Sequence, residues 1–166
     1  DERKENVDFS IEYVTSKQYV ILPEGTTIST IEDLDGMNIG VQTGTTGDFI
    51  IGDAINGTDD AEPLIPNATS NGYTSAILAA QDLLSGRLDA VVIDRLPAEN
   101  IATVNADAGL TTTELLYADT TEEYAICVQK GNTELLEAIK ATLQRLIDEG
   151  KIDEFLVNHT AAAAVE

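Results

Sequence analysis

The chain has 166 residues, 43% of them hydrophobic, which suits one or at most two small domains with a buried core. Thirty acidic residues against nine basic ones give a formal net charge of −21. Such a surface repels phosphates and therefore argues against nucleic acids and anionic membranes as partners. The charge is compatible both with solubility alone and with electrostatic attraction of cationic solutes.

The sequence offers little for redox, metal or enzymatic chemistry. Cys127 is the only cysteine, which excludes an intrachain disulfide and a thiolate metal cluster. Because it lies in the apolar segment 124–128, the sequence predicts a buried structural thiol. No nucleophile, base and orienting group occur together, and no metal-ligand spacing is present. We therefore expect a protein that is not an enzyme and that uses no metal or cofactor.

Strand and helix signals alternate along the chain, a pattern typical of an α/β fold with a largely parallel sheet. Turn residues and helix caps set the limits of most of these elements. In chain order we expect a strand at 19–22, a helical turn at 29–34, a strand at 38–42, a helix opening at 48, a loop at 56–71 around a weak strand at 64–65, a helix at 75–84, a strand at 89–93, a helix at 97–104, strands at 115–117 and 124–128, and helices at 133–149 and 152–157.

The helix predicted at 133–149 has an apolar stripe along one face. Burying one such side chain is worth roughly 1.5–3 kcal/mol, so the stripe needs a sheet to cover it. Six large residues form it: Leu135, Leu136, Ile139, Leu143, Leu146 and Ile147.

Four short motifs carry the functional signal. They are Asp1-Glu2-Arg3, Asp8-Phe9-Ser10, Gly-Val-Gln-Thr-Gly-Thr-Thr at 40–46 and Asp-Ala-Val-Val-Ile-Asp at 89–94. Together they place a cation, a turn rich in hydroxyl and N–H groups, and a carboxylate at the ends of predicted strands. These groups suit a free α-amino acid, whose carboxylate needs a cation and N–H donors and whose ammonium needs an anion. In order and spacing, from residue 1 to about 156, the motifs resemble the family-3 extracellular solute-binding proteins of polar amino acid ABC transporters.

Each candidate residue has a structural alternative. Arg3 can pair with a ligand carboxylate through its planar guanidinium, or it is a solvated charge at a chain end. Gln42, Thr45 and Thr46 follow a strand and precede a helix, where N–H groups bind anions, although any βα turn favours Gly and Thr. Asp94 ends a strand at its carboxyl end, where α/β sheets bind ligands, or it is a helix N-cap.

The resemblance implies a role for each of these positions. Arg3, Thr45 and Thr46 match positions that meet the ligand carboxylate in the family, and Asp94 matches the position that receives the ammonium. Gln42 matches a position that often lines the side-chain region of the cleft.

The resemblance also implies a fold, of the type II periplasmic binding protein kind, in which two α/β lobes are joined by two extended crossovers. By this likeness residues 18–122 form one complete three-layer lobe, and residues 1–17 and 123–166 form the residual part of the other lobe. The family's pattern has a substantial stretch before the position of Asp1, so the chain resembles an N-terminally truncated member.

The function implied by the resemblance is capture of a polar amino acid for an ABC importer. The expected partners are the amino acid and the membrane permease, and the expected location is extracytoplasmic, in the periplasm or at the cell surface as a lipoprotein. A homo-oligomer of the truncated chain is also expected, because the stripe at 133–149 lacks part of its sheet. The alternatives are a sensory module of the same fold that binds a protein partner, and a lyase or dehydratase acting on small carboxylates.

Overall fold

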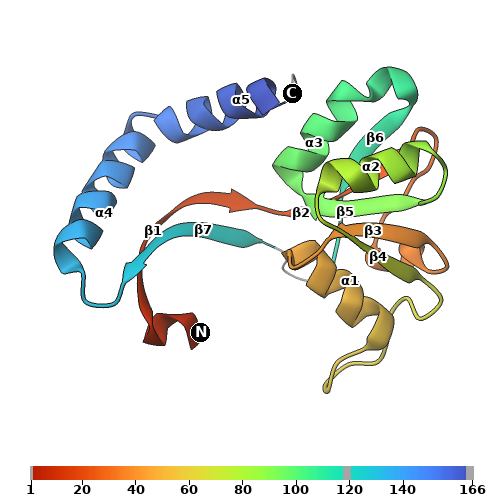
Figure 1. The fold of residues 1–166 in the computed structure, drawn as a ribbon, viewed down its shortest axis with the longest axis horizontal. Helices are drawn as coiled ribbons and strands as arrows, with labels where there is room; N and C mark the ends of the chain where they lie inside the picture. Colours follow the sequence, from red (N-terminus) through yellow and green to blue (C-terminus); the bar gives the residue numbers. More distant parts are fainter. Residues whose placement is uncertain (1, 118–120, 164–166) are drawn as a thin grey trace. The chain divides into compact units, whose positions relative to one another are not determined.

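The computed structural model describes residues 2–117 and 121–163, which form two compact units (Figure 1). The first unit contains the described residues up to Ser16 and from Thr121 onward, and the second contains those from Lys17 to 117. Among the described residues, no helix combines the length and apolar character that crossing a bilayer requires.

The second unit is built on a five-stranded sheet with the strand order β4-β3-β5-β2-β6. Strand β3 runs parallel to β4 and β5, whereas β2 runs antiparallel to β5 and to β6. Four strands therefore point the same way and β2 alone is reversed, so the prediction of a mostly parallel sheet is confirmed. The strands are β2 (Gln18–Pro23), β3 (Asn38–Gln42), β4 (Thr69–Tyr73), β5 (Ala90–Asp94) and β6 (Leu110–Glu114).

Helices cover both faces of this sheet (Figure 1). Helix α1 (Thr46–Asn56) and the 3-10 turn η2 (Ile31–Leu34) pack on one face through a cluster that includes Ile51 and Val92. Helices α2 (Ala76–Leu84) and α3 (Arg95–Val104) pack on the other face, in a cluster that includes Val91. A short 3-10 turn, η3 (Ala106–Ala108), follows α3. The three layers confirm the predicted α/β class.

Two of the strand predictions were wrong. The segments 64–65 and 115–117 are not strands, whereas Thr69–Tyr73 and Leu110–Glu114 are. Both observed strands are polar and lie at the edges of the sheet, where they have one neighbour each. Their extended conformation comes from pairing, of β4 with β3 and of β6 with β2. A search for apolar runs in the sequence does not detect such pairing.

The first unit contains a two-stranded antiparallel sheet and two helices. Helix α4 lies on the sheet and buries Leu136 and Leu143 there, together with Val128 of β7. Leu135 and Ile147 remain exposed, so the predicted apolar stripe is only partly covered. The elements are η1 (Glu2–Glu5), β1 (Val7–Ser16), β7 (Glu122–Gln129), α4 (Thr133–Asp148) and α5 (Lys151–Ala163).

The prediction that Cys127 is buried was wrong, because its side chain is exposed. Cys127 lies opposite Phe9 in the ladder between β1 and β7. Successive side chains of a strand point to opposite faces, and the neighbouring Val128 is the buried one. An apolar run in a two-stranded sheet thus has only one covered face.

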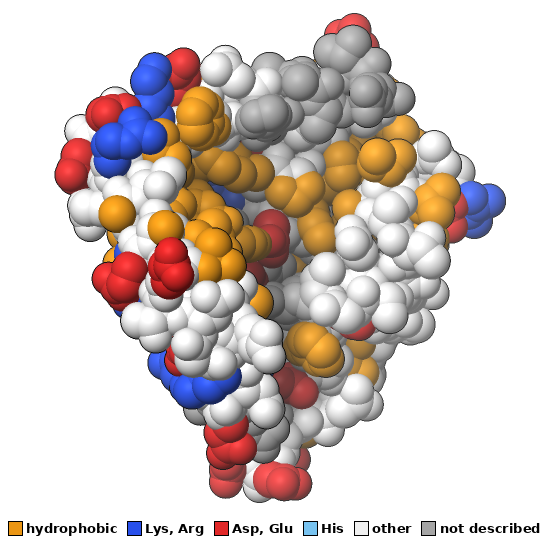
Figure 2. Space-filling model, turned by 60° about the vertical axis from the view of Figure 1, so that its left-hand side comes forward, with side chains coloured by type: hydrophobic (Ala, Val, Ile, Leu, Met, Phe, Trp, Pro, Cys, Tyr) orange, Lys and Arg blue, Asp and Glu red, His pale blue; other side chains and the backbone are white. Residues whose placement is uncertain are grey.

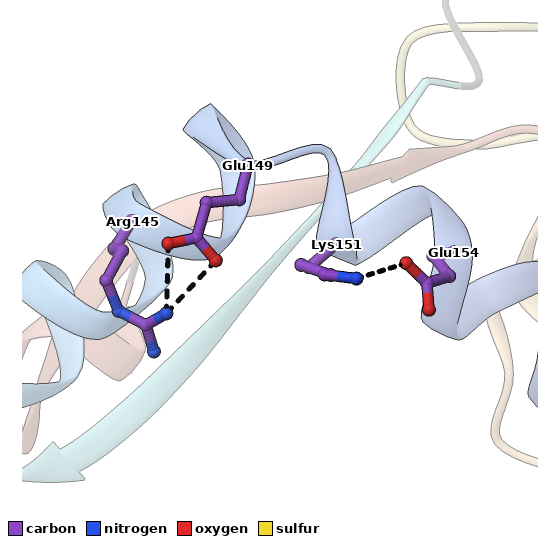
Figure 3. A network of polar contacts seen from close by, with 4 residues as sticks. All are labelled: Arg145, Glu149, Lys151 and Glu154. Atoms are coloured by element: carbon purple, nitrogen blue, oxygen red, sulfur yellow. Dashed lines mark hydrogen bonds and ion pairs between the residues drawn. The ribbon is translucent and has the colours of Figure 1, made fainter.

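Two ion pairs lie in the region where α4 ends and α5 begins (Figure 3). Arg145 Nη1 lies 3.1 Å from Glu149 Oε2, and Lys151 Nζ lies 2.5 Å from Glu154 Oε2. The hydrogen bond to Glu154 raises the pKa of the Lys151 ammonium. Both pairs are solvent-exposed, so screening leaves them a small contribution to stability.

The charges of the second unit are strongly unbalanced. Its only basic residues are Lys17, Arg87 and Arg95, and each forms an ion pair within the unit, with Glu114, Asp82 and Glu99 respectively. The carboxylates of this unit far outnumber its three basic residues, so on balance they repel one another. Salt screens such repulsion, because the Debye length falls from about 10 Å at 0.1 M to about 3 Å at 1 M ionic strength.

We expect raising NaCl from 0.1 to 1 M to slow hydrogen exchange of the β3 and β5 amides by about fivefold or more. Neutralising the exposed loop carboxylates Asp59, Asp60 and Glu62 as Asn, Asn and Gln should reduce this dependence. A control variant has the same change in net charge but in the first unit, with Glu137, Glu149 and Glu154 changed to Gln. This control should leave the NaCl dependence of exchange in β3 and β5 unchanged. Exchange in β3 and β5 that does not respond to NaCl would contradict the prediction.

Candidate functional site

The carboxyl ends of β3 and β5 lie side by side in the second unit. The two strands are parallel neighbours, with Val41 paired to Val92. Gln42 ends β3 and Asp94 ends β5, so the two residues reach the same edge of the sheet. In α/β sheets this is the edge at which ligands bind.

The turn that leads from β3 into α1 is held together by its own hydrogen bonds. Gly44 has a φ of +79°, a left-handed conformation that glycine adopts without strain, and its N–H donates to Asp48 Oδ2 at 2.9 Å. Thr45 is the N-cap of α1, and its Oγ1 accepts from the Asp48 N–H. The Thr45 hydroxyl and N–H both donate to the Gln42 carbonyl, at 2.8 and 3.2 Å. Both donors of Thr45 are therefore used within the turn.

Thr46 is the first residue of α1 and is followed by the buried Gly47. The first N–H groups of a helix have no acceptor inside that helix, and the helix dipole gives this end a partial positive charge. The start of α1, at Thr46, can therefore receive a carboxylate.

Asp94 is half-buried at the end of β5. Its Oδ1 accepts a hydrogen bond of 2.5 Å from the side-chain Nε2 of Gln18. Asp94 occupies the N-cap position of α3, but its side chain makes no capping hydrogen bond. The alternative reading of Asp94 as a helix cap is therefore not supported by its contacts.

Gln42 connects the end of β3 to the next helix. Its Oε1 accepts a hydrogen bond of 3.2 Å from the N–H of Ala76, the first residue of α2. The side-chain carbonyl thus caps α2, which fixes the direction of the Gln42 amide at the edge of the sheet.

Arg3 belongs to the first unit. Its guanidinium carbon lies 5.8 Å from the centre of the Phe9 ring, a cation–π distance, and it lines a hollow of about 800 Å³ together with Glu12, Tyr124 and Lys130. The structure thus brings Gln42, Thr45, Thr46 and Asp94 together in one unit, and Arg3 lies in the other.

Asp8 has a structural role in the first unit. Its carboxylate lies 2.8 Å from Lys130 Nζ and accepts from the N–H of Gly131 at 2.9 Å. The hydrogen bond from Lys130 is the main cause of its lowered pKa. These contacts tie the start of β1 to the turn after β7.

Sequence reasoning missed Gln18 and Gly47. Gln18 is fully buried at the start of β2 and contacts Asp94, and a side chain at Gly47 would collide with Gln18. The available signal was a polar residue directly before the apolar run 19–22, which reads as an ordinary strand boundary. Its partner depends on the antiparallel pairing of β2 with β5 and could not be inferred from spacing.

The model of the bacterial extracellular solute-binding proteins, family 3, matches residues 1–160 of the chain. The chain belongs to this family. The probable histidine-binding protein of Neisseria gonorrhoeae is 32% identical over 162 residues, or 97% of this chain. The L-cystine-binding protein TcyJ of Escherichia coli is 30% identical over 92% of this chain. The solved structure of AbpA, an amino acid ABC transporter substrate-binding protein from Streptococcus pneumoniae bound to L-arginine, superposes with a TM-score of 0.81 at 27% identity.

The chain spans little more than half the length of the curated relatives it matches. It covers 57% of the Neisseria protein, 53% of TcyJ and 65% of the AbpA chain. The match to AbpA includes 100% of this chain. These likenesses confirm the type II periplasmic binding protein fold expected from the sequence.

Proposed function

We propose that the chain is the amino acid-binding part of a solute-binding protein that captures a polar amino acid for an ABC importer. The observation that carries this proposal is the placement of Asp94 and the start of α1 at one edge of the sheet in a family-3 chain. One group there is an anion and the other attracts anions, which matches the two charged ends of an α-amino acid.

In this proposal five residues form the site for one amino acid. Arg3, Thr46 and the first N–H groups of α1 receive the carboxylate, Thr45 holds the turn that presents them, and Asp94 receives the ammonium. Gln42 lines the region of the ligand side chain. The hydrogen bonds of Thr45 and Gln42 support these roles because they fix both residues at the carboxyl end of β3.

We further propose that residues 18–122 are a complete second lobe and that residues 1–17 and 123–166 are part of the first. The division into compact units at Ser16 and at Thr121 supports this assignment. The family-3 membership supports an extracytoplasmic location, a membrane permease as partner and a binding role without catalysis.

Calorimetric titration with the twenty amino acids and cystine, on the full-length form that the gene encodes, tests the proposed function. Saturable binding of a polar amino acid is expected. Absence of binding to all of them, with intact folding, would overturn the proposal and favour a module that binds a protein partner. Turnover of a small carboxylate, followed by NMR, would favour a lyase.

We also propose that the 166-residue chain self-associates through its first unit. Side chains of α4 and α5 are exposed there, among them Leu135, Phe155 and Val157, the last at 70%. Hydrophobic side chains reach the surface on the face displayed in Figure 2. Exposed apolar side chains of this kind favour association, once salt screens the net negative charge.

Light scattering at 0.5 M NaCl is expected to give a mass above that of one chain, 17.7 kDa. Changing Phe155 and Val157 to Ser should return the mass to that value. Ile77→Ser, a control at an exposed apolar position of the second unit, should not. A strict monomer at high concentration would contradict self-association.

A further inference from the structure

Gln18 is a polar side chain in an otherwise apolar core. It is 0% exposed and begins β2, where it pairs with Asp94 across the antiparallel ladder. Its Nε2 donates to Asp94 Oδ1 at 2.5 Å. Because burying an amide is costly unless it is hydrogen-bonded, this bond holds both side chains in one arrangement.

The same amide lies against the first turn of α1. A Cβ placed on Gly47 would be 2.8 Å from Gln18 Oε1 and 3.2 Å from both Cγ1 and the carbonyl oxygen of Val92. Glycine is therefore the residue that leaves room for the Gln18 amide at this point. One end of the amide contacts Asp94 and the other end lies beside the start of α1.

We propose that Gln18 is a positioning residue for the amino acid site, an inference that rests on the proposed function. By holding Oδ1, Gln18 fixes the plane of the Asp94 carboxylate and so the direction of Oδ2, which accepts from the ligand ammonium. By filling the space under Gly47, it also sets how far Asp94 lies from the start of α1, which receives the ligand carboxylate. A neutral amide does this without cancelling the charge of Asp94, as a lysine or arginine would.

The test separates positioning from general stability by comparing two probes on the full-length form that the gene encodes. One is L-arginine, and the other is 5-guanidinopentanoate, the same molecule without its α-amino group. Gln18→Met keeps a similar length but removes the donor. We expect it to weaken L-arginine binding about tenfold and 5-guanidinopentanoate binding less than about twofold, because the second probe has no ammonium to orient.

Two glycines of α1 give a matched pair for the same measurement. Gly47→Ala pushes on the Gln18 amide and should reproduce the selective loss. Gly52→Ala lies in the same helix with no atom within 4 Å of the added Cβ and should leave both affinities unchanged. Equal weakening of both probes by Gln18→Met, or no change in either, would overturn the inference.

A measurement on the unliganded protein keeps the test of this inference separate from the test of the proposed function. In the unliganded protein, Asp94→Asn and Gly47→Ala should each move the side-chain NH₂ resonances of Gln18, whereas Gly52→Ala should not. Unmoved resonances would overturn the positioning contact even if amino acids bind. If wild type binds none of the twenty amino acids, the proposed function and the role of Gln18 in binding both fail, whatever these resonances show.

Discussion

Replacing Asp94 by asparagine is expected to weaken amino acid binding by about 1.5–3 kcal/mol, the range for hydrogen bonds to charged groups. This corresponds to a rise in Kd of about tenfold to about 150-fold. The reason is that asparagine keeps the shape of the side chain but removes the negative charge that, in the proposed site, faces the ligand ammonium. Calorimetric titration of the full-length form measures the change.

Asp89 offers a control next to the other end of the same strand. It lies directly before β5, at the opposite end from Asp94, and its Oδ2 accepts from the N–H and the Nδ2 of Asn38. Asp89→Asn is the same chemical change and should leave the affinity as it is. If Asp94→Asn also leaves the affinity unchanged, Asp94 has no part in the site.

Truncating Ile51 to alanine is expected to destabilise the second unit by about 2–5 kcal/mol. Ile51 is fully buried in the cluster between α1 and the sheet, so the change leaves a cavity beneath the helix that carries Thr46 and Gly47. Hydrogen exchange of the α1 and β3 amides reports the free energy of opening in this unit.

Phe49 provides the comparison within the same helix. It is 65% exposed, and Phe49→Ala should change the opening free energy by no more than about 0.5 kcal/mol. A cost below about 1 kcal/mol for Ile51→Ala would mean that α1 is not anchored by this side chain.

The parts of the fold that could be predicted are those in which local pattern and tertiary role agree. The β-branched run 19–22 and the run 38–42 are buried strands in the structure, because central strands of a sheet need apolar side chains on both faces. The polar edge strands Thr69–Tyr73 and Leu110–Glu114 could not be found in this way. Their backbone is extended because a neighbouring strand pairs with it.

The candidate site likewise has residues that could be predicted and residues that could not. Asp94 and the turn at 43–46 could be located because strand ends and Gly-Thr turns have visible signatures, and parallel strands bring them to one edge. Gln18 could not, since its contact depends on which residue of β2 pairs with Asp94. The exposure of Cys127 was missed for a related reason: the sequence does not tell whether a strand is covered on one face or on two.

Chemical-shift mapping tests the central claim most directly. Backbone amide spectra of the full-length form are recorded while the tightest-binding of the twenty amino acids is added. The account predicts saturable shifts that are largest at the amides of Thr45, Thr46 and Gly47 and around Asp94. Saturable binding whose shifts lie elsewhere, with these amides unmoved, would contradict it.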